Sequence, residues 1–100
     1  VHDLAKISTQ ETDMPVYRDL LIGYLLRHGY GVAPSMREKR SALAWFQRAA
    51  QNGDARQEET LAMAAHIEAA SCYHFGDCAR KDLDEAVRLY GDLLRRHFHP

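Results

Sequence analysis

Apolar residues mark four segments of the chain as helical. The first is rich in Leu, Ile and Tyr and the third in alanine, while the second and fourth repeat apolar residues at the spacing of one helix face. The segments cover residues 15–28, 37–51, 56–75 and 82–97. No segment alternates between apolar and polar residues with period two, as a half-buried β-strand would. The pattern predicts an all-α fold with about four main helices. Residues 1–14 lack a clear pattern, and we expect an N-terminal arm or a short helix there.

Helix boundaries are indicated by capping and turn residues. Thr12-Asp13-Met14-Pro15 offers a capping side chain before a proline that suits the first turn. Asn52-Gly53-Asp54 is a turn-forming run that we expect to end the second helix. Asp82 and Glu85 have the spacing of a capping box at the start of the last helix. Gly91 lies inside that helix at a cost of about 1 kcal/mol relative to Ala, which a close crossing by another backbone would explain.

Short loops join the four predicted helices, so consecutive helices should be antiparallel neighbours. They form two α/α hairpins, over residues 15–55 and 56–100, within one structural domain. A single hairpin cannot bury its apolar face, and the two must therefore share a core.

The two hairpins also share a sequence pattern. The first has a glycine within its first helix, a Gly-x-Gly-Val turn and an alanine-rich second helix with an aromatic pair, and the second keeps part of this pattern. The residues that carry it are Gly23, Gly29, Gly31, Ala42, Trp45, Phe46, Ala49, Ala50 and Gly53, followed by Gly76, Ala86 and Tyr90. The pattern resembles the Sel-1-like repeat, a relative of the tetratricopeptide repeats.

The resemblance implies an α/α superhelix in which the second repeat is degenerate. Packing considerations agree with it: Gly23 would let the helices of the first hairpin approach closely, while Trp45 and Phe46 would supply buried area. Ala49 and Ala50 would leave room for the next hairpin.

The same resemblance implies a non-enzymatic adaptor that binds a protein partner, as such repeats do in bacterial signalling, secretion or envelope assembly. The compartment would be the bacterial cytoplasm or periplasm. A peptide or helix would lie on the concave face built by the first helix of each hairpin, held by a few anchor side chains. The candidate contact residues on those helices are Tyr17, Tyr24, His28, His66 and Tyr73.

Composition narrows the alternatives. The chain has 100 residues, 13 basic and 14 acidic, so its formal net charge is −1. Nucleic-acid binding needs a basic surface, which this balance does not supply. The apolar runs are too short to cross a membrane. We therefore expect neither a nucleic-acid partner nor a membrane span.

The histidines and cysteines raise the question of a metal or catalytic site. Cys72, His74 and Cys78 lie close in sequence, and His97-Phe98-His99 ends the last predicted helix. None of the usual zinc-ligand spacings occurs, and Cys72 and His74 point about 200° apart on a helix. No serine lies in a nucleophile-elbow motif. We expect no enzyme activity, no metal and no cofactor.

The two cysteines leave one further question open. A bridge between Cys72 and Cys78 is geometrically feasible because the chain folds back after Gly76. Two cysteines alone do not define a redox compartment, and we expect reduced thiols. Two alternatives to the adaptor stay open: a self-associating structural domain or part of a longer repeat array, and a thiol- or metal-linked regulator.

Overall fold

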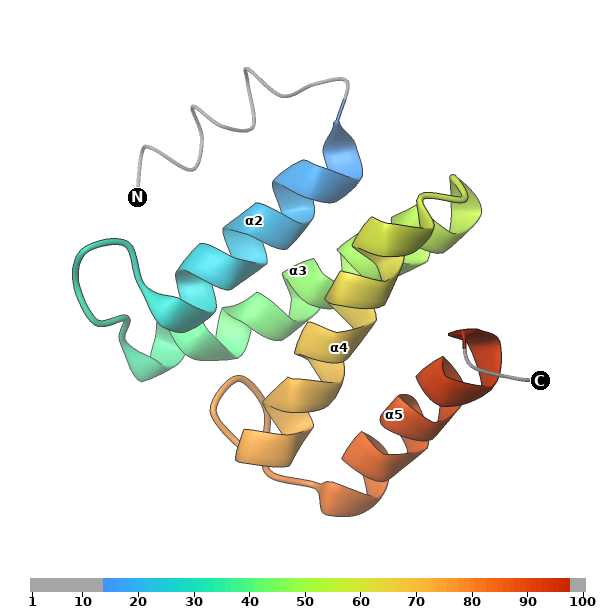
Figure 1. Cartoon of the computed structure of the whole chain (residues 1–100). Coiled ribbons are helices and arrows are strands. Elements are labelled where there is room, and N and C mark those ends of the chain that lie inside the picture. The colour runs from blue at the N-terminus through green and yellow to red at the C-terminus, as the bar shows by residue number, and fades with distance from the viewer. Residues whose placement is uncertain (1–13, 98–100) are drawn as a thin grey trace.

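A computed structural model describes residues 14–97 as four α-helices joined by short loops (Figure 1). They are α2 (Pro15–His28), α3 (Met36–Ala55), α4 (Glu59–Phe75) and α5 (Leu83–His97). No strand occurs within residues 14–97, and the all-α prediction is confirmed. Residues 1–13 and 98–100 lie outside the described part of the chain. They include the expected N-terminal arm except Met14, the expected cap at Thr12 and Asp13, and His99.

The second helix is longer than the sequence predicts. We expected Asn52-Gly53-Asp54 to end it, whereas α3 continues to Ala55. Gly53 is buried inside the helix, where a Cβ atom would lie 2.9 Å from the Cα of Ala62. The glycine thus serves a close approach between α3 and α4, and the turn falls at residues 56–58.

A capping box that the sequence analysis missed opens α3. The Glu38 amide donates to Ser35 Oγ at 3.1 Å, and the Ser35 amide donates to Glu38 Oε1 at 2.9 Å. The Ser-x-x-Glu spacing was readable in the sequence, but Ser35 lies before the segment 37–51 in which we expected the helix.

At the start of α5 the capping box is only half formed. The Glu85 amide donates to Asp82 Oδ1 at 3.0 Å, as predicted. The Glu85 carboxylate, however, accepts hydrogen bonds from Arg88, and the Asp82 amide donates to the carbonyl oxygen of Tyr73. The Glu85 carboxylate is therefore bound by the Arg88 guanidinium and not by the Asp82 amide. That amide is bound to a backbone carbonyl of α4.

Small side chains dominate the core, which brings the helices close together. One buried cluster holds Ala42, Phe46, Ala69, Cys72 and Cys78, and the other holds Val16, Ala49, Ala50 and Ala65. A Cβ atom at Gly23 would lie 2.7 Å from Cε1 of Phe46, so the expected close contact between α2 and α3 is confirmed. Trp45, expected to be buried, is only half-buried.

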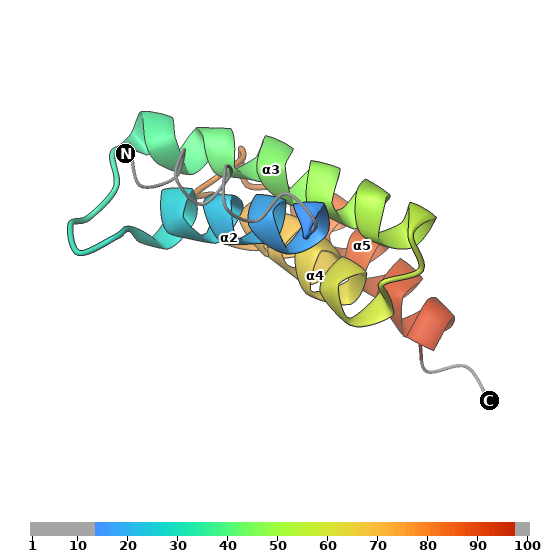
Figure 2. The ribbon, with the colours of Figure 1, turned by 90° about the horizontal axis from the view of Figure 1, so that it is seen from above.

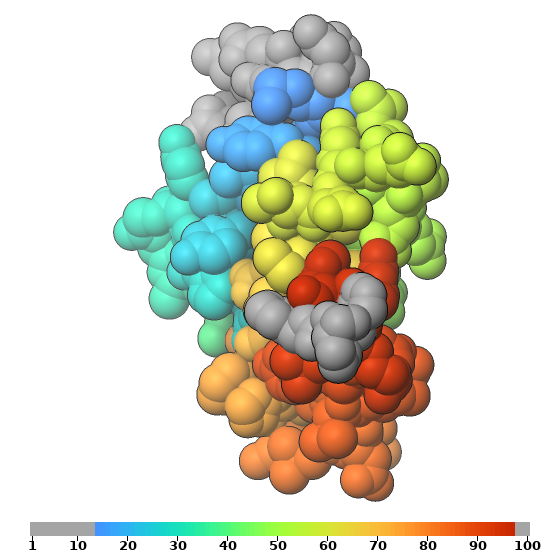
Figure 3. Space-filling model, turned by 45° about the vertical axis from the view of Figure 1, so that its right-hand side comes forward, coloured from blue at the N-terminus to red at the C-terminus, as the bar shows by residue number. Residues whose placement is uncertain are grey.

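The helices pack in sequence order, with α4 against α3 and α5 against α4. Seen from above, α2 and α4 lie on the same side of α3 (Figure 2). The space-filling view shows α5 on the outside of the molecule, beyond α4 (Figure 3). No other backbone within residues 14–97 crosses closely at Gly91, where a Cβ atom would meet only Nη1 of Arg95, at 3.6 Å. The expected crossing at this glycine is absent from the described chain.

Candidate functional site

A disulfide joins Cys72, near the end of α4, to Cys78 in the loop before α5. The expectation of reduced thiols was wrong. Gly76 adopts the left-handed conformation with φ 72° and turns the chain back directly after α4. This brings the two Cα atoms to 4.9 Å, inside the range that a disulfide spans. Both cysteines are buried in the core beside Phe46.

Beside the disulfide, Arg27 of α2 reaches across to the loop between α4 and α5. Its guanidinium is only 4% exposed and donates from Nε to Asp77 Oδ2 at 2.9 Å and from Nη2 to Oδ1 at 3.0 Å. Nη2 also donates to Ser71 Oγ at 3.0 Å. Burial opposes ionisation of Asp77, but hydrogen bonds and charge from Arg27 outweigh it and hold the pKa of Asp77 below its ordinary value.

The buried carboxylate of Asp19 ties α2 to α3. Arg48 Nε lies 3.1 Å from Asp19 Oδ2, and Arg18 Nε donates to Oδ1 at 3.2 Å. The sequence analysis singled out neither this contact nor that of Arg27. A signal was present: Arg27 follows Val16, Leu20 and Gly23 at helical spacing, on the stripe that forms the core. Its partner Asp77, 50 residues away, showed no comparable pattern in the sequence.

The three candidate contact residues on α2 lie together beside α4. Tyr17 and Tyr24 are seven positions apart, and both are exposed. The rings of Tyr24 and His28 have centroids 4.4 Å apart. His28 Nε2 lies 3.4 Å from Oε1 of Glu68 on α4, so this surface continues from one helix to the next. We call it the α2–α4 face, defined by Tyr17, Tyr24, His28 and Glu68.

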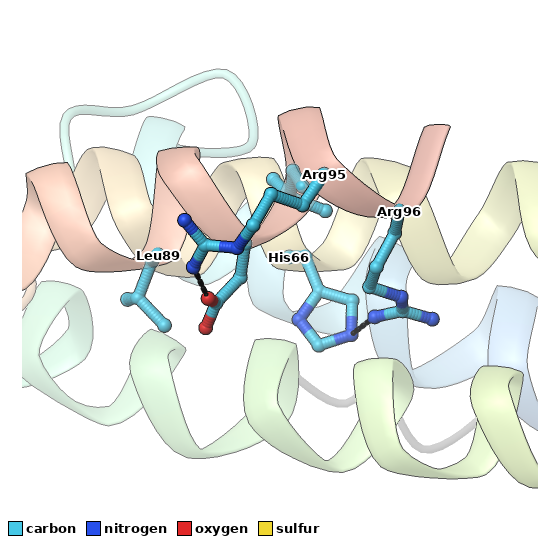
Figure 4. A pocket seen from close by; sticks show the side chains of 6 residues that line it. His66, Leu89, Arg95 and Arg96 are labelled. Atoms are coloured by element: carbon cyan, nitrogen blue, oxygen red, sulfur yellow. Dashed lines mark hydrogen bonds and ion pairs between the residues drawn. The ribbon is translucent and has the colours of Figure 1, made fainter. Parts of the chain in front are cut away.

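The other two candidates lie on a different side of α4, toward α5. His66 Nε2 is 2.9 Å from Asp54 Oδ2 at the end of α3 and 3.3 Å from Nη1 of Arg96 on α5. Figure 4 shows the imidazole below α5, beside the Arg96 guanidinium. Tyr73 is seven residues further along and shares that side of the helix. The structure therefore splits the five candidates into two groups.

Two exposed apolar side chains on α4 lie nearer to Glu68, around the helix axis, than His66 and Tyr73 do. Phe75 follows Glu68 by seven positions, and Ile67 precedes Phe75 by eight. Both are exposed. Phe75 shares the side of α4 that carries Glu68, where we had expected His66 and Tyr73, whereas Ile67 is turned about 100° away from Glu68. The exposure of Ile67 and Phe75 was not predicted from the sequence, because the rotation of α4 about its axis decides which of its residues face outward.

A hollow of about 290 Å³ lies beside His66, lined also by Leu89, Asp92, Leu93, Arg95 and Arg96 (Figure 4). Its charges are internally paired. Arg96 Nη2 donates to Asp54 Oδ1 at 2.7 Å, and Arg95 is paired with Asp92. Burial opposes ionisation of Asp54, but hydrogen bonds from Arg96 and His66 keep its pKa below the ordinary value. These contacts make the hollow a joint between α3, α4 and α5 more than an open charged site.

Residues 14–97 contain histidine, cysteine and acidic side chains of the kinds that bind metal ions. In that range no group of three histidine, cysteine or acidic side chains is placed to hold a metal ion. The disulfide removes both thiolates from the candidate set around His74. None of the four described helices is long and apolar enough to span a bilayer.

Two antiparallel hairpins that share one core define an α/α repeat protein. The model of the Sel1 repeat family matches residues 20–54 and 64–91, one segment in each hairpin. These matches cover more than half of the chain, and the protein belongs to the Sel1 repeat family. No curated protein and no solved structure gave a match to the chain. Sel1 repeats are generally helical protein–protein interaction modules and are typically non-enzymatic.

Proposed function

We propose that this chain is an adaptor that binds a peptide or helix of a partner protein on the α2–α4 face. The observation that carries the proposal is the exposure of Tyr17 and Tyr24 on one side of α2, next to the contact between His28 and Glu68. Tyrosine offers a large contact area and a hydroxyl at a low cost in conformational entropy, and it is enriched among residues that dominate binding energy.

The surroundings of the face support this role. Buried Arg27 and half-buried Asp77 link α2 to the loop after α4, and the disulfide ties that loop to α4. A partner would therefore meet a surface that is already ordered, which lowers the entropy lost on binding. Phe75, exposed on the side of α4 that carries Glu68, would add an apolar contact near the end of α2.

The test compares two variants that each remove exposed tyrosines. Tyr17→Ala/Tyr24→Ala alters the face, whereas Tyr30→Ala removes a 67% exposed tyrosine from the loop after α2. Tagged protein captures partners from a lysate of the source organism, and a captured protein is then purified and titrated by calorimetry. Circular dichroism confirms that both variants remain folded.

We expect the double variant to weaken binding of the purified partner at least tenfold, while Tyr30→Ala binds like wild type. A tenfold change corresponds to about 1.4 kcal/mol, within the range of a single anchor residue. Equal binding by all three proteins would place the contact elsewhere and overturn the proposal.

We also propose an oxidising compartment, such as the bacterial periplasm, as the working location. The support is the Cys72–Cys78 disulfide, because such bonds persist mainly outside the reducing cytosol. Cells would be quenched in acid and their thiols labelled with a maleimide before mass spectrometry. Unlabelled protein supports this location, and two added labels per chain contradict it.

A further inference from the structure

The outer surface of α5 carries an apolar stripe that no described helix covers. Leu83, Val87 and Leu94 are each more than half exposed. Their spacings of four and seven place them within about 40° of arc on the helix. Tyr90 lies beside this line and is half-buried. We call these four residues the α5 stripe.

The internal repeat aligns the α5 stripe with positions on α3, whose surroundings can be compared. Aligning Ala42 with Ala86 pairs Leu43 with Val87, and Ala50 with Leu94. In the first repeat, Leu43 packs against the core that α4 completes, and Ala50 shares a buried cluster with Ala65 of α4. The α5 stripe thus corresponds to a surface that another helix covers in the first repeat.

A further helix could not pack on α5 in the same way as α4 packs on α3. The contact of α3 with α4 depends on Gly53, whose missing Cβ leaves room for the backbone of Ala62. The aligned residue on α5 is His97, and the small Ala50 is replaced by Leu94. Whatever covers the stripe must therefore pack through larger side chains.

The stripe and its flanking charges are complementary to themselves in antiparallel orientation. Placing Leu83 opposite Leu94 of a second copy also places Val87 opposite Tyr90 of that copy. The first turn of α5 contains Asp84 and Glu85, whereas the last turn contains Arg95, Arg96 and His97. Antiparallel packing brings the acidic turn of each copy next to the basic turn of the other.

Two details within the chain fit this register. Asp84 flanks the stripe and makes no ion pair with any residue in 14–97, and Arg95 of the second copy would lie near it. Gly91 lies close to the midpoint of the register and meets only the tip of Arg95 within the described residues. A second helix crossing there would use the close approach that this glycine permits.

We propose that a second copy of this chain covers the α5 stripe, forming a two-fold symmetric, antiparallel α5–α5 dimer. A C2 interface uses the same patch on both subunits, as the self-complementary stripe requires. The 15-residue helix is about 22 Å long, and one such face buries less than the roughly 800 Å² per partner of a standard interface. We therefore expect a weak dimer, with a Kd of about 10–100 μM.

Sedimentation equilibrium between about 5 μM and 1 mM tests the dimer on the whole chain. Val87→Glu places a charge at the centre of the stripe, and Val32→Glu makes the same change at an exposed valine in the loop after α2. We expect wild type and Val32→Glu to approach twice the monomer mass, and Val87→Glu to remain monomeric. A monomeric wild type, or equal association of both variants, overturns the proposal and leaves the stripe for a different occupant.

Charge exchange tests the antiparallel register. Asp84→Arg and Arg95→Asp should each weaken association at least tenfold, because each places like charges together at both ends. The double variant Asp84→Arg/Arg95→Asp should recover most of the lost affinity. Association that the single variants reduce and the double variant does not restore overturns the antiparallel arrangement.

Discussion

The two sides of α4 are built in different ways. Toward α3, the contact consists of buried small residues, and α3 itself buries Ala42, Phe46, Ala49, Ala50 and Gly53. Toward α5, the partner helix buries only Ala86 and Leu93. The second hairpin has instead a disulfide at its turn and a partly buried ion pair from that turn to Arg27 of α2. Close packing thus stabilises the first repeat, and covalent and ionic links supplement weaker packing in the second.

The largest expected effect follows from the aligned aromatic residues Phe46 and Tyr90. Phe46 is fully buried, and Phe46→Ala should destabilise the fold by about 3–5 kcal/mol. Tyr90 is half-buried, and Tyr90→Ala should cost less than half as much. Urea unfolding followed by circular dichroism measures both values. Equal losses would show that the second repeat is packed as tightly as the first.

The disulfide provides the next effect. Cys72→Ala/Cys78→Ala should lower the free energy of unfolding by about 2 kcal/mol, because the bridge closes a short loop and restricts the unfolded chain. Hydrogen exchange should then rise more in α5 than in α2 and α3. As a control, a dithiol reductant should leave the variant unchanged. Uniformly faster exchange in all four helices would contradict the idea that the bridge acts mainly on the second repeat.

The two helical glycines form a matched pair with a smaller effect. Gly53→Ala should cost about 1–2 kcal/mol, because the added methyl group would meet the Ala62 backbone. Gly91→Ala meets no such obstacle within the chain and should stabilise the monomer by up to about 1 kcal/mol through helix propensity. Thermal unfolding at low protein concentration measures both changes. Stabilisation by both substitutions would refute the close contact at Gly53.

The smallest effect is a dependence on pH. The pKa of Asp77 is lowered in the folded state, so its contribution is present above the unfolded-state pKa near 4 and is lost as the pH falls through the lower folded value. Wild type should therefore lose more stability between pH 6 and pH 3 than Asp77→Asn does. Glu59→Gln, at an exposed position outside the α5 stripe, is the control. Parallel pH profiles for wild type and Asp77→Asn would contradict a stabilising role for this carboxylate.

Most of the fold was readable from local signals. Helical periodicity, turn residues and the repeated pattern are encoded over short stretches, and they correctly predicted four helices in two hairpins. The Asn-Gly-Asp run misled because its local preference for a turn was overridden by the contact of Gly53 with Ala62. Such a contact joins residues that periodicity alone cannot relate.

The candidate site was less accessible to sequence reasoning. Spacing puts Tyr17, Tyr24 and His28 on one side of α2, and their contact with a partner stays a prediction. It could not show that His66 turns toward Asp54, because this depends on how α4 is rotated against its neighbours. Predicting the disulfide required knowing the direction of the chain after Gly76. The left-handed conformation of Gly76 sets that direction.

The buried Arg27 also bears on how the protein forms during synthesis. Its partner Asp77 follows 50 residues later, which takes about 3–10 s at ordinary translation rates. Until then, the guanidinium lacks its carboxylate, and packing α4 with Ser71 against it would bury an unpaired charge at a substantial desolvation cost. The first repeat therefore cannot reach its final packing while the second is still being made. The two repeats should mature together, as one cooperative unit, once the turn that carries Asp77 has emerged.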